Sequence, residues 1–302
     1  MLQLFYTDHF VLPLPAGHRF PMSKYQLLRD EVSSYIDVEL QEAPLATMED
    51  LLLVHDSHYV DKVIHGELSP SEQREIGFPW SELMVIRSRR SAGATIAATM
   101  SAWKFGVAIN LAGGTHHSYA DKGSGFCVFN DAAIAAKKIQ ERMKSHLGRQ
   151  LRVAIIDLDV HQGNGTASIM QDDLSVFTFS MHGEKNFPFR KERSDLDIAL
   201  MDGCEDIEYL QALSDGLAEL EKVFSAEFVI FLAGADPYEG DRLGRLCLSK
   251  EGLRLRDEKV LQWCFDRRIP VSIVMAGGYG KTIEDTVAIH AQTIRTAIAY
   301  QW

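Results

Sequence analysis

The sequence lacks the features of several large classes of protein. No apolar run approaches the roughly 20 residues that span a bilayer, and the first residues contain no basic segment followed by an apolar one. We therefore expect no membrane association. Positive charge is also scarce, since 31 Lys and Arg residues stand against 42 Asp and Glu residues, for a net charge of −11. This balance argues against a nucleic-acid partner, which needs a basic face, whereas an acidic surface would attract cationic substrates such as acylated lysine peptides or polyamines.

Cysteine is rare and its positions are scattered. The four cysteines are Cys127, Cys204, Cys247 and Cys264, and no two of them form a Cys-x-x-Cys pair. Isolated thiols of this kind are typical of a reducing compartment. We therefore expect a cytoplasmic protein.

Short β-branched runs alternate with longer amphipathic segments along the whole chain. With 302 residues, of which 46% are hydrophobic and 24% charged, the chain is long enough to bury a full core. The predicted strands are 2–6, 107–111, 153–157, 176–180, 228–232 and 271–275, and the predicted helices are 81–105, 130–145, 207–224, 250–267 and 283–300. This alternation predicts an α/β fold, with a mostly parallel multi-stranded sheet and helices on both faces. No linker, repeat or composition break divides the sequence, so we expect residues 1–302 to form a single domain.

Three residues are predicted to start helices. Ser81 and Ser249 precede amphipathic segments and are expected N-caps. Thr282, followed three residues later by Asp285, resembles a capping box.

Polar residues follow four of the predicted strands where each strand ends. Strand 107–111 continues into Gly-Gly-Thr-His-His at 113–117, and strand 153–157 into Asp159 and His161. Strands 228–232 and 271–275 continue into Asp236 and into Gly-Gly-Tyr at 277–279. Because ligands bind at the carboxyl ends of the strands in open α/β sheets, we expect one site at this edge.

The Asp-x-Asp-x-His run is the strongest chemical signal in the sequence. Residues two and four positions apart share one face of a strand, so Asp157, Asp159 and His161 can converge. Carboxylate oxygen and imidazole nitrogen are ligands for zinc or a similar divalent ion. His116 and His117 have no cysteines nearby, which indicates proton transfer rather than further ligation. The chain is therefore predicted to be a metal-dependent hydrolase.

The polar blocks together resemble the zinc-dependent histone deacetylase family. The matching blocks, in the order of the family, are 113–117, 125–131, 157–165, 234–236 and 277–279. Blocks 157–165, 239–244 and 278–279 are similar in particular to the class IV histone deacetylase and its bacterial relatives. The resemblance implies an arginase/deacetylase-like fold. It also implies a zinc-dependent amidohydrolase that removes an acetyl or longer acyl group from lysine side chains of a protein or peptide.

The resemblance implies two metal sites. Asp159, His161 and Asp236 would bind Zn²⁺ and leave a coordination position open for water and the substrate carbonyl. A structural K⁺ would lie near Asp157, Asp159, His161, Ser180 and Met181. The residues by themselves do not suggest potassium.

The resemblance also assigns catalytic roles. His117 would be the general base and later the acid that protonates the leaving amine. His116, beside Asp157, would be a charged neighbour of the tetrahedral intermediate, and Tyr279 would donate a hydrogen bond to the oxyanion. Asn164 departs from the pattern of many deacetylases, which have Asp there. A neutral amide can orient His117 but cannot raise its pKa electrostatically.

A narrow tunnel for a lysine-like side chain is implied as well. Gly125, Phe126 and Phe187 would form its walls and Leu243 its rim. An aromatic residue beside a glycine loop belongs to the core about as often as to a substrate wall. His182, close to these residues in the sequence, receives no role.

Three other functions stay open. A binuclear ureohydrolase would need a carboxylate two residues after His161, where this chain has Gly163. An acetylpolyamine or other small acetyl-amine deacetylase would have a glutamate at the position of Leu243, although Glu239 lies nearby. A catalytically silent acyl-lysine binder would not need every catalytic position to be filled. The length of the acyl group is not predicted.

Overall fold

One parallel sheet forms the centre of the structure. The structure is a computed structural model that describes residues 1–15 and 17–301. In these residues eight strands pair in the order β2-β1-β3-β8-β7-β4-β5-β6, and every neighbouring pair is parallel. The strands are β1 (Leu2–Tyr6), β2 (Val38–Glu42), β3 (Val107–Asn110), β4 (Val153–Asp157), β5 (Val176–Gly183), β6 (Leu196–Leu200), β7 (Phe228–Leu232) and β8 (Val271–Val274). The predicted α/β class with a parallel sheet is confirmed.

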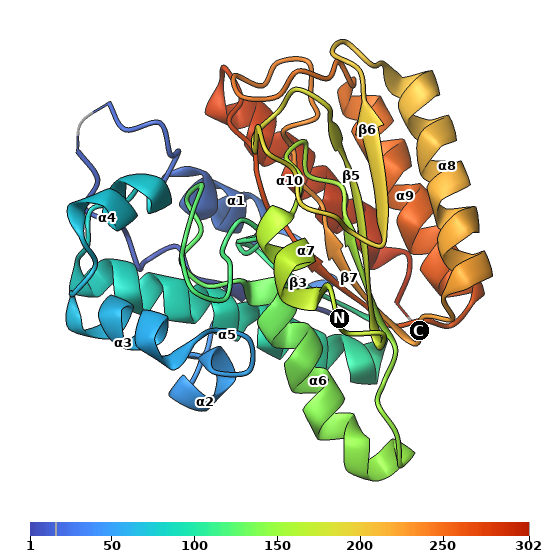
Figure 1. Cartoon of the computed structure of the whole chain (residues 1–302). Coiled ribbons are helices and arrows are strands. Elements are labelled where there is room, and N and C mark those ends of the chain that lie inside the picture. Colours follow the sequence, from blue (N-terminus) through green and yellow to red (C-terminus); the bar gives the residue numbers. More distant parts are fainter. Residues whose placement is uncertain (16, 302) are drawn as a thin grey trace.

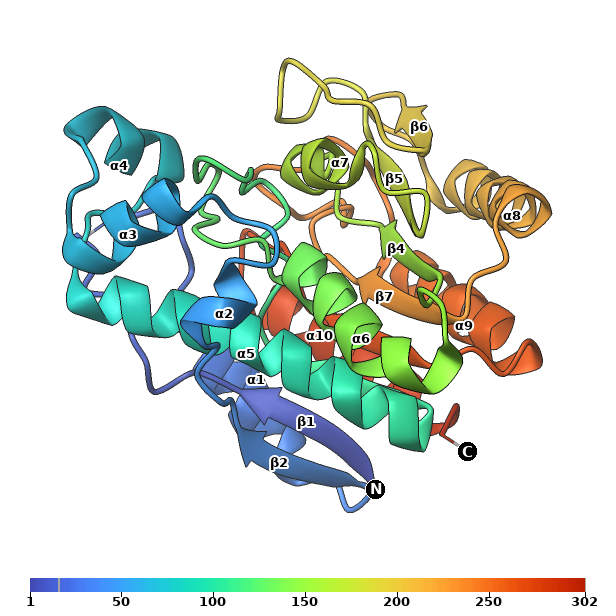
Figure 2. The same ribbon diagram turned by 60° about the horizontal axis from the view of Figure 1, so that its bottom comes forward.

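Helices cover both faces of the sheet (Figure 1). They are α1 (Lys24–Val32), α2 (Met48–Leu51), α3 (Ser57–His65), α4 (Pro70–Ile76), α5 (Glu82–Phe105), α6 (Asp131–Leu147), α7 (Asn164–Met170), α8 (Asp206–Val223), α9 (Lys250–Asp266) and α10 (Ile283–Ile298). Helices α5 and α6 lie side by side against one face, and α1, α8, α9 and α10 pack on the other (Figure 2). Among the described residues, no helix combines the length and the apolar character that crossing a bilayer requires.

The central strands are apolar on both faces because both faces are covered. In β4, Ala154 and Ile156 pack on the side of α8 and α9, whereas Val153 and Ile155 pack on the side of α5 and α6. This follows from the alternation of side chains along a strand. A sheet buried on both faces therefore gives continuous apolar runs rather than alternating ones, and it leaves polar side chains only at the strand ends.

Helices α2, α3 and α4 form a third apolar cluster with the first half of α5, at the side of the molecule away from α8 (Figure 1). This cluster contains Phe129 and is flanked by Phe126, so it supports the segment that follows the two histidines. The backbone N–H groups of Gly125 and Phe126 donate to the carbonyl oxygens of Glu75 and Ile76 at the end of α4. The small helices thus position one wall of the site.

Every predicted strand and helix is present, but the structure contains further elements that were not predicted. Ser81 and Ser249 cap α5 and α9 by accepting from the backbone N–H groups of Met84 and Gly252. The capping box predicted at Thr282 is wrong, because its side chain makes no cap hydrogen bond and instead donates to the Asp285 carboxylate. The sequence did not predict the two edge strands β2 and β6 or the helices α1, α2, α3, α4 and α7.

Candidate active site

A cluster of three possible metal ligands lies at the carboxyl ends of two neighbouring central strands. Asp159 and His161 follow β4, Asp236 follows β7, and β4 pairs with β7. The ligand atoms of the three side chains lie within 4.8 Å of one another, and all three side chains are buried. Asp236 Oδ1 accepts from the backbone N–H of Val160, but Asp236 Oδ2 has no hydrogen-bond partner among the described residues. Because buried polar atoms are normally satisfied, an orphaned carboxylate oxygen in such a cluster fits a cation ligand.

The charges of the cluster support the same fit. His161 Nδ1 lies 2.9 Å from Asp159 Oδ1 and 3.2 Å from Asp236 Oδ2. Burial and the charge of Asp159 raise the pKa of Asp236 to about 7. Burial opposes the charged form of His161, but the two neighbouring carboxylates outweigh burial and raise the pKa of His161 to about 10. The cluster therefore retains a proton that a divalent cation would displace.

One glycine beside the cluster and another beside Asp157 leave no room for a side chain. The N–H of Gly277 donates to Asp159 Oδ2 over 2.8 Å, and a Cβ on Gly277 would lie 1.9 Å from Asp236 Oδ2. A Cβ on Gly163 would lie 2.3 Å from Asp157 Oδ2. No carboxylate-bearing residue fits at position 163, and this argues against the second metal of a ureohydrolase.

His116 and Asp157 form a buried ion pair next to the cluster. His116 Nδ1 lies 2.6 Å from Asp157 Oδ2, and both side chains are almost fully buried. Burial opposes the charge of His116, but the carboxylates of Asp157 and Asp159 outweigh it and raise the pKa of His116 to about 9. His116 is therefore a fixed cation near neutral pH.

His117 belongs to a different network, which keeps it neutral. Asn164 Nδ2 donates to the Tyr119 hydroxyl, so the Asn164 Oδ1 atom accepts from His117 Nδ1 over 2.6 Å. Tyr119 in turn donates to Glu192 over 3.1 Å. Burial and the charges of His116 and His161 hold the pKa of His117 well below its usual value. The Nε2 atom of His117 is thus left as an available base.

Two carboxylates that the sequence analysis did not single out hold the surrounding loops. Asp131 is fully buried and accepts from the backbone N–H groups of Gly114 and Thr115 and from the hydroxyls of Thr115 and Thr95. These bonds fix the segment that carries the two histidines. Asp241 accepts from the backbone N–H groups of Leu243, Gly244 and Tyr279. The signal for both was present, because each lies inside a block that resembles the deacetylase family.

The ring of Tyr279 lies close to His161 and Phe126. It is 6.5 Å from that of His161 and 6.2 Å from that of Phe126, centroid to centroid. Burial, together with the charges of Asp159 and Asp236, raises the pKa of Tyr279 well above its usual value. The phenol is therefore protonated. Its hydroxyl makes no hydrogen bond with any residue that the structure describes, so it is free to donate.

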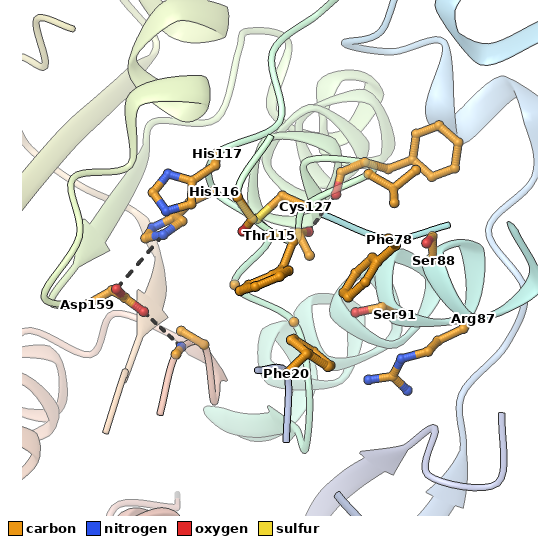
Figure 3. Close-up of a pocket in the computed structure, with 18 of the residues that line it drawn as sticks. Phe20, Phe78, Arg87, Ser88, Ser91, Thr115, His116, His117, Cys127 and Asp159 are labelled. Carbon is orange, nitrogen blue, oxygen red and sulfur yellow. Dashed lines mark hydrogen bonds and ion pairs between the residues drawn. The ribbon is translucent and has the colours of Figure 1, made fainter. Parts of the chain in front are cut away.

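The groups around the metal cluster line a cavity of about 60 Å³ that runs inward from them. Figure 3 shows His116, His117 and Asp159 at one end of this cavity and Arg87 at the other. The Arg87 side chain is buried, with its guanidinium carbon 4.4 Å from the centre of the Tyr25 ring and Nη1 3.4 Å from Thr7 Oγ1. No sequence pattern connects α5 with the site, so this cation was not predicted.

The predicted wall residues surround the outer opening. Gly125, Phe126, Phe187 and Leu243 line a second cavity that opens to the surface and reaches His117, His161 and Tyr279. The Phe187 ring stands edge-on against His117, with 4.8 Å between ring centroids. Phe126 lines both cavities and stacks on Phe78.

The residues predicted to hold potassium come from neighbouring strands. Asp157 in β4 lies opposite Ser180 in β5, and Met181 follows in the same strand. Ser180 hydrogen-bonds to His182 Nδ1 over 3.0 Å, which gives His182 a buried polar partner. Burial lowers the pKa of His182 to about 4, so it is neutral.

Known proteins resemble this chain along almost its whole length. Residues 18–294 match the histone deacetylase domain. An uncharacterized protein of Picosynechococcus sp. is 44% identical over 295 residues, which cover 97% of each protein. Histone deacetylase 2 of Arabidopsis thaliana is 34% identical over 249 residues, or 79% of this chain and 63% of that protein, so the match spans less than two thirds of that relative.

Solved structures of HDAC homologues have the same fold. The crystal structure of an HDAC homologue from Aquifex aeolicus matches 98% of this chain and 84% of its own, with a TM-score of 0.83 and 24% identity. A structure of an HDAC homologue complexed with SAHA gives the same values. The predicted resemblance to the superfamily is confirmed, whereas the likeness to class IV stays a prediction. The chain belongs to the histone deacetylase family, which makes it a hydrolase of the deacetylase type.

Proposed function

We propose that this protein is a zinc-dependent deacylase that hydrolyses the amide of an acylated lysine side chain. The observation that carries the proposal is the buried cluster of Asp159, His161 and Asp236. The neutral His117 and the free phenol of Tyr279 line the same cavity as Asp159 and His161. When bound by these three side chains, zinc would polarise the acyl carbonyl and lower the pKa of a water molecule to about 7.

His117 would act first as a base and then as an acid. Its Nδ1–H is bound to Asn164, so Nε2 would accept the proton of the attacking water. The low pKa of His117 keeps this nitrogen unprotonated near neutral pH. After attack, the same nitrogen would give the proton to the departing lysine amine.

Two groups would stabilise the charge that develops on the carbonyl oxygen. Tyr279 is protonated and has an uncommitted hydroxyl, so it would donate to the oxyanion. His116, held as a cation by Asp157, would add a positive charge that is in place before the reaction. Both groups would act without reorganisation, because burial fixes their positions.

The remaining features of the proposal concern the surroundings of the site. The aromatic walls at Phe126 and Phe187 suit an unbranched alkyl chain. We further propose a K⁺ ion near Asp157, Asp159, His161, Ser180 and Met181, a single catalytic domain over the chain, and a class IV relationship based on Asn164 and block 157–165. The four free cysteines support a cytoplasmic location.

Metal content and substrate range test the proposal together. Elemental analysis should find one zinc per chain, and fluorogenic lysine substrates from acetyl to myristoyl should be hydrolysed, with inhibition by a hydroxamate. Acetylated polyamines belong in the same panel as the competing substrates. Two manganese ions per chain would indicate a ureohydrolase, and a metal-free protein that binds acyl-lysine without hydrolysing it would indicate a silent binder.

A further inference from the structure

The outer opening of the site is basic, although the chain as a whole is acidic. Arg19, Lys185 and Arg245 line the opening beside the aromatic walls. They come from three separate segments, namely the loop before α1, the loop after β5 and the loop after β7. No Asp or Glu is among the described residues that line it, whereas the whole chain carries a net charge of −11.

These cations are only partly neutralised by their neighbours. Asp202 lies 3.2 Å from Arg245 Nη1 and 3.9 Å from Lys185 Nζ, and both basic side chains are still more than half exposed. Arg19 is exposed and makes no ion pair within residues 1–15 and 17–301. Glu184 precedes Lys185 and is exposed, but it does not line the opening. The opening thus has three basic side chains but only one carboxylate in contact with them, and that carboxylate contacts two of the three.

An exposed aromatic residue stands beside the cations. Phe189 is 87% exposed and lines the opening, with its ring edge-on to Phe187 at 6.3 Å between centroids. A large apolar side chain in this position offers a surface for the part of a substrate that stays outside the tunnel. The opening therefore combines positive charge with one apolar platform.

We propose that the opening selects acylated amines whose outer part carries carboxylates, such as an acyl-lysine flanked by Asp or Glu, and disfavours polycationic substrates. This inference rests on the proposed deacylase function and narrows its substrate class. Carboxylates next to the acyl-lysine would lie within the Debye length of about 8 Å from the basic side chains, and arginine pairs with carboxylates through two parallel bonds. A polyamine or a lysine-rich segment would bring like charges to the same place.

Matched peptides test the inference on the unaltered protein. Three acetyl-lysine peptides would differ only in the residues on either side of the lysine, which would be Asp, Ala or Arg. We expect kcat/KM to be roughly tenfold higher for the Asp peptide than for the Arg peptide at low salt, mostly through KM, because rim charges act on association. The difference should shrink at high ionic strength. Acetylspermidine should be a poor substrate.

Two further experiments test whether the basic side chains cause the preference, and whether the substrate is a protein or a small molecule. Charge reversal by Arg245→Glu and Arg19→Glu should invert the peptide preference, whereas Lys104→Glu should not. Lys104 is an exposed lysine at the end of α5, next to the start of β3. It therefore lies at the amino ends of the strands, whereas the site lies at their carboxyl ends. Free Nε-acetyl-lysine has its own carboxylate. If it is hydrolysed better than the Asp peptide, the carboxylate comes from a small molecule rather than from a protein.

The outcomes distinguish this inference from the proposed function. Equal rates for the three peptides, or a preference for Arg peptides or acetylspermidine, would overturn the basic-opening inference while the deacylase proposal stands. Absence of hydrolysis of every acyl-lysine substrate by zinc-loaded protein would instead remove the deacylase proposal itself.

Discussion

The ring of His117 is oriented by an amide, with 2.6 Å between His117 Nδ1 and Asn164 Oδ1. A carboxylate in the place of the amide would orient the ring equally well but would also stabilise its charged form. Asn164 thus fixes the tautomer of His117, and its hydrogen bond favours the charged ring less than a carboxylate would, because an amide has no net charge. The neighbouring cation His116 acts in the opposite direction and disfavours a charge on His117.

Replacing Asn164 by Asp should therefore move the pH dependence of the enzyme. The pKa of His117 is well below 6.5, and activity needs the neutral ring, so the acidic limb of kcat/KM should lie below that pH in the unaltered protein. In Asn164→Asp the limb should shift to higher pH, because the new anion favours imidazolium. A structure of the variant would confirm that the ring is in place. An unshifted limb with the ring in place would mean that His117 is not the base.

Tyr119 should support catalysis through Asn164 without touching the substrate. Tyr119→Phe removes the acceptor of Asn164 Nδ2, so the amide can rotate and the tautomer of His117 is no longer fixed. We expect kcat to fall about fivefold, the equivalent of one hydrogen bond of about 1 kcal/mol. Tyr300→Phe is the matched control, since it removes an exposed hydroxyl that bonds to Gln262 far from the site. Equal kcat values for the two variants would show that Tyr119 does not support catalysis through Asn164.

Loss of one metal ligand should empty the site and leave the fold intact. Asp236→Ala removes Oδ2, which has no hydrogen-bond partner among the described residues, and Oδ1, which accepts from the backbone N–H of Val160. The fold therefore loses one hydrogen bond and should survive. Zinc content should drop to background and activity should be almost abolished, with an unchanged circular dichroism spectrum. Asp172→Ala, at an exposed aspartate, serves as the control. Full zinc content in Asp236→Ala would show that the ligands lie elsewhere.

Tyr279→Phe should slow the chemical step with the metal retained. The substitution removes one hydroxyl and leaves the ring contacts with Phe126 and His161. By comparison with other oxyanion donors, kcat should fall by roughly 10²–10³-fold. Elemental analysis of the same sample should show unchanged zinc. A rate near that of the unaltered protein would mean that the hydroxyl does not reach the carbonyl.

Asp131 should be important for stability as well as for activity. Asp131→Ala leaves the partly buried backbone N–H groups of Gly114 and Thr115 without an acceptor. Buried unsatisfied groups cost about 1–3 kcal/mol each, so the free energy of unfolding should fall by roughly 3 kcal/mol in urea titrations. Asp131→Asn keeps an acceptor oxygen and should lose less. Equal losses for the two variants would show that only the charge matters.

The parts that the sequence predicted best are those whose environment leaves a local pattern. Strands β4 and β7 are apolar throughout because both faces are buried, and their predicted bounds match the observed ones. The edge strands β2 and β6 are half exposed and carry charged residues, so no apolar run marks them. Helix α7 begins with Asn-Gly-Thr, which are poor helix formers, and it is stabilised by tertiary contacts instead.

Within the site, the predictable residues are those that lie in the polar blocks after strands. His117 and Asp159 could be placed at one edge of the sheet, because parallel strands end together. Arg87 and Glu192 could not, because each reaches the site from a segment with no such position and depends on side-chain packing. The charge of the opening was also not predictable, because overall composition does not reveal where individual charges gather.

The strand order has a consequence for how the protein is made. β8 is the last strand of the chain, yet it lies in the middle of the sheet between β3 and β7. Before residues 271–274 leave the ribosome, the sheet exists only as two separate halves, β2-β1-β3 and β7-β4-β5-β6. The second half carries the three proposed metal ligands, and the first carries the two histidines proposed to act in catalysis. We therefore expect that metal affinity can arise earlier in folding than activity, and that hydrogen-exchange protection of β3 and β7 appears together with that of β8.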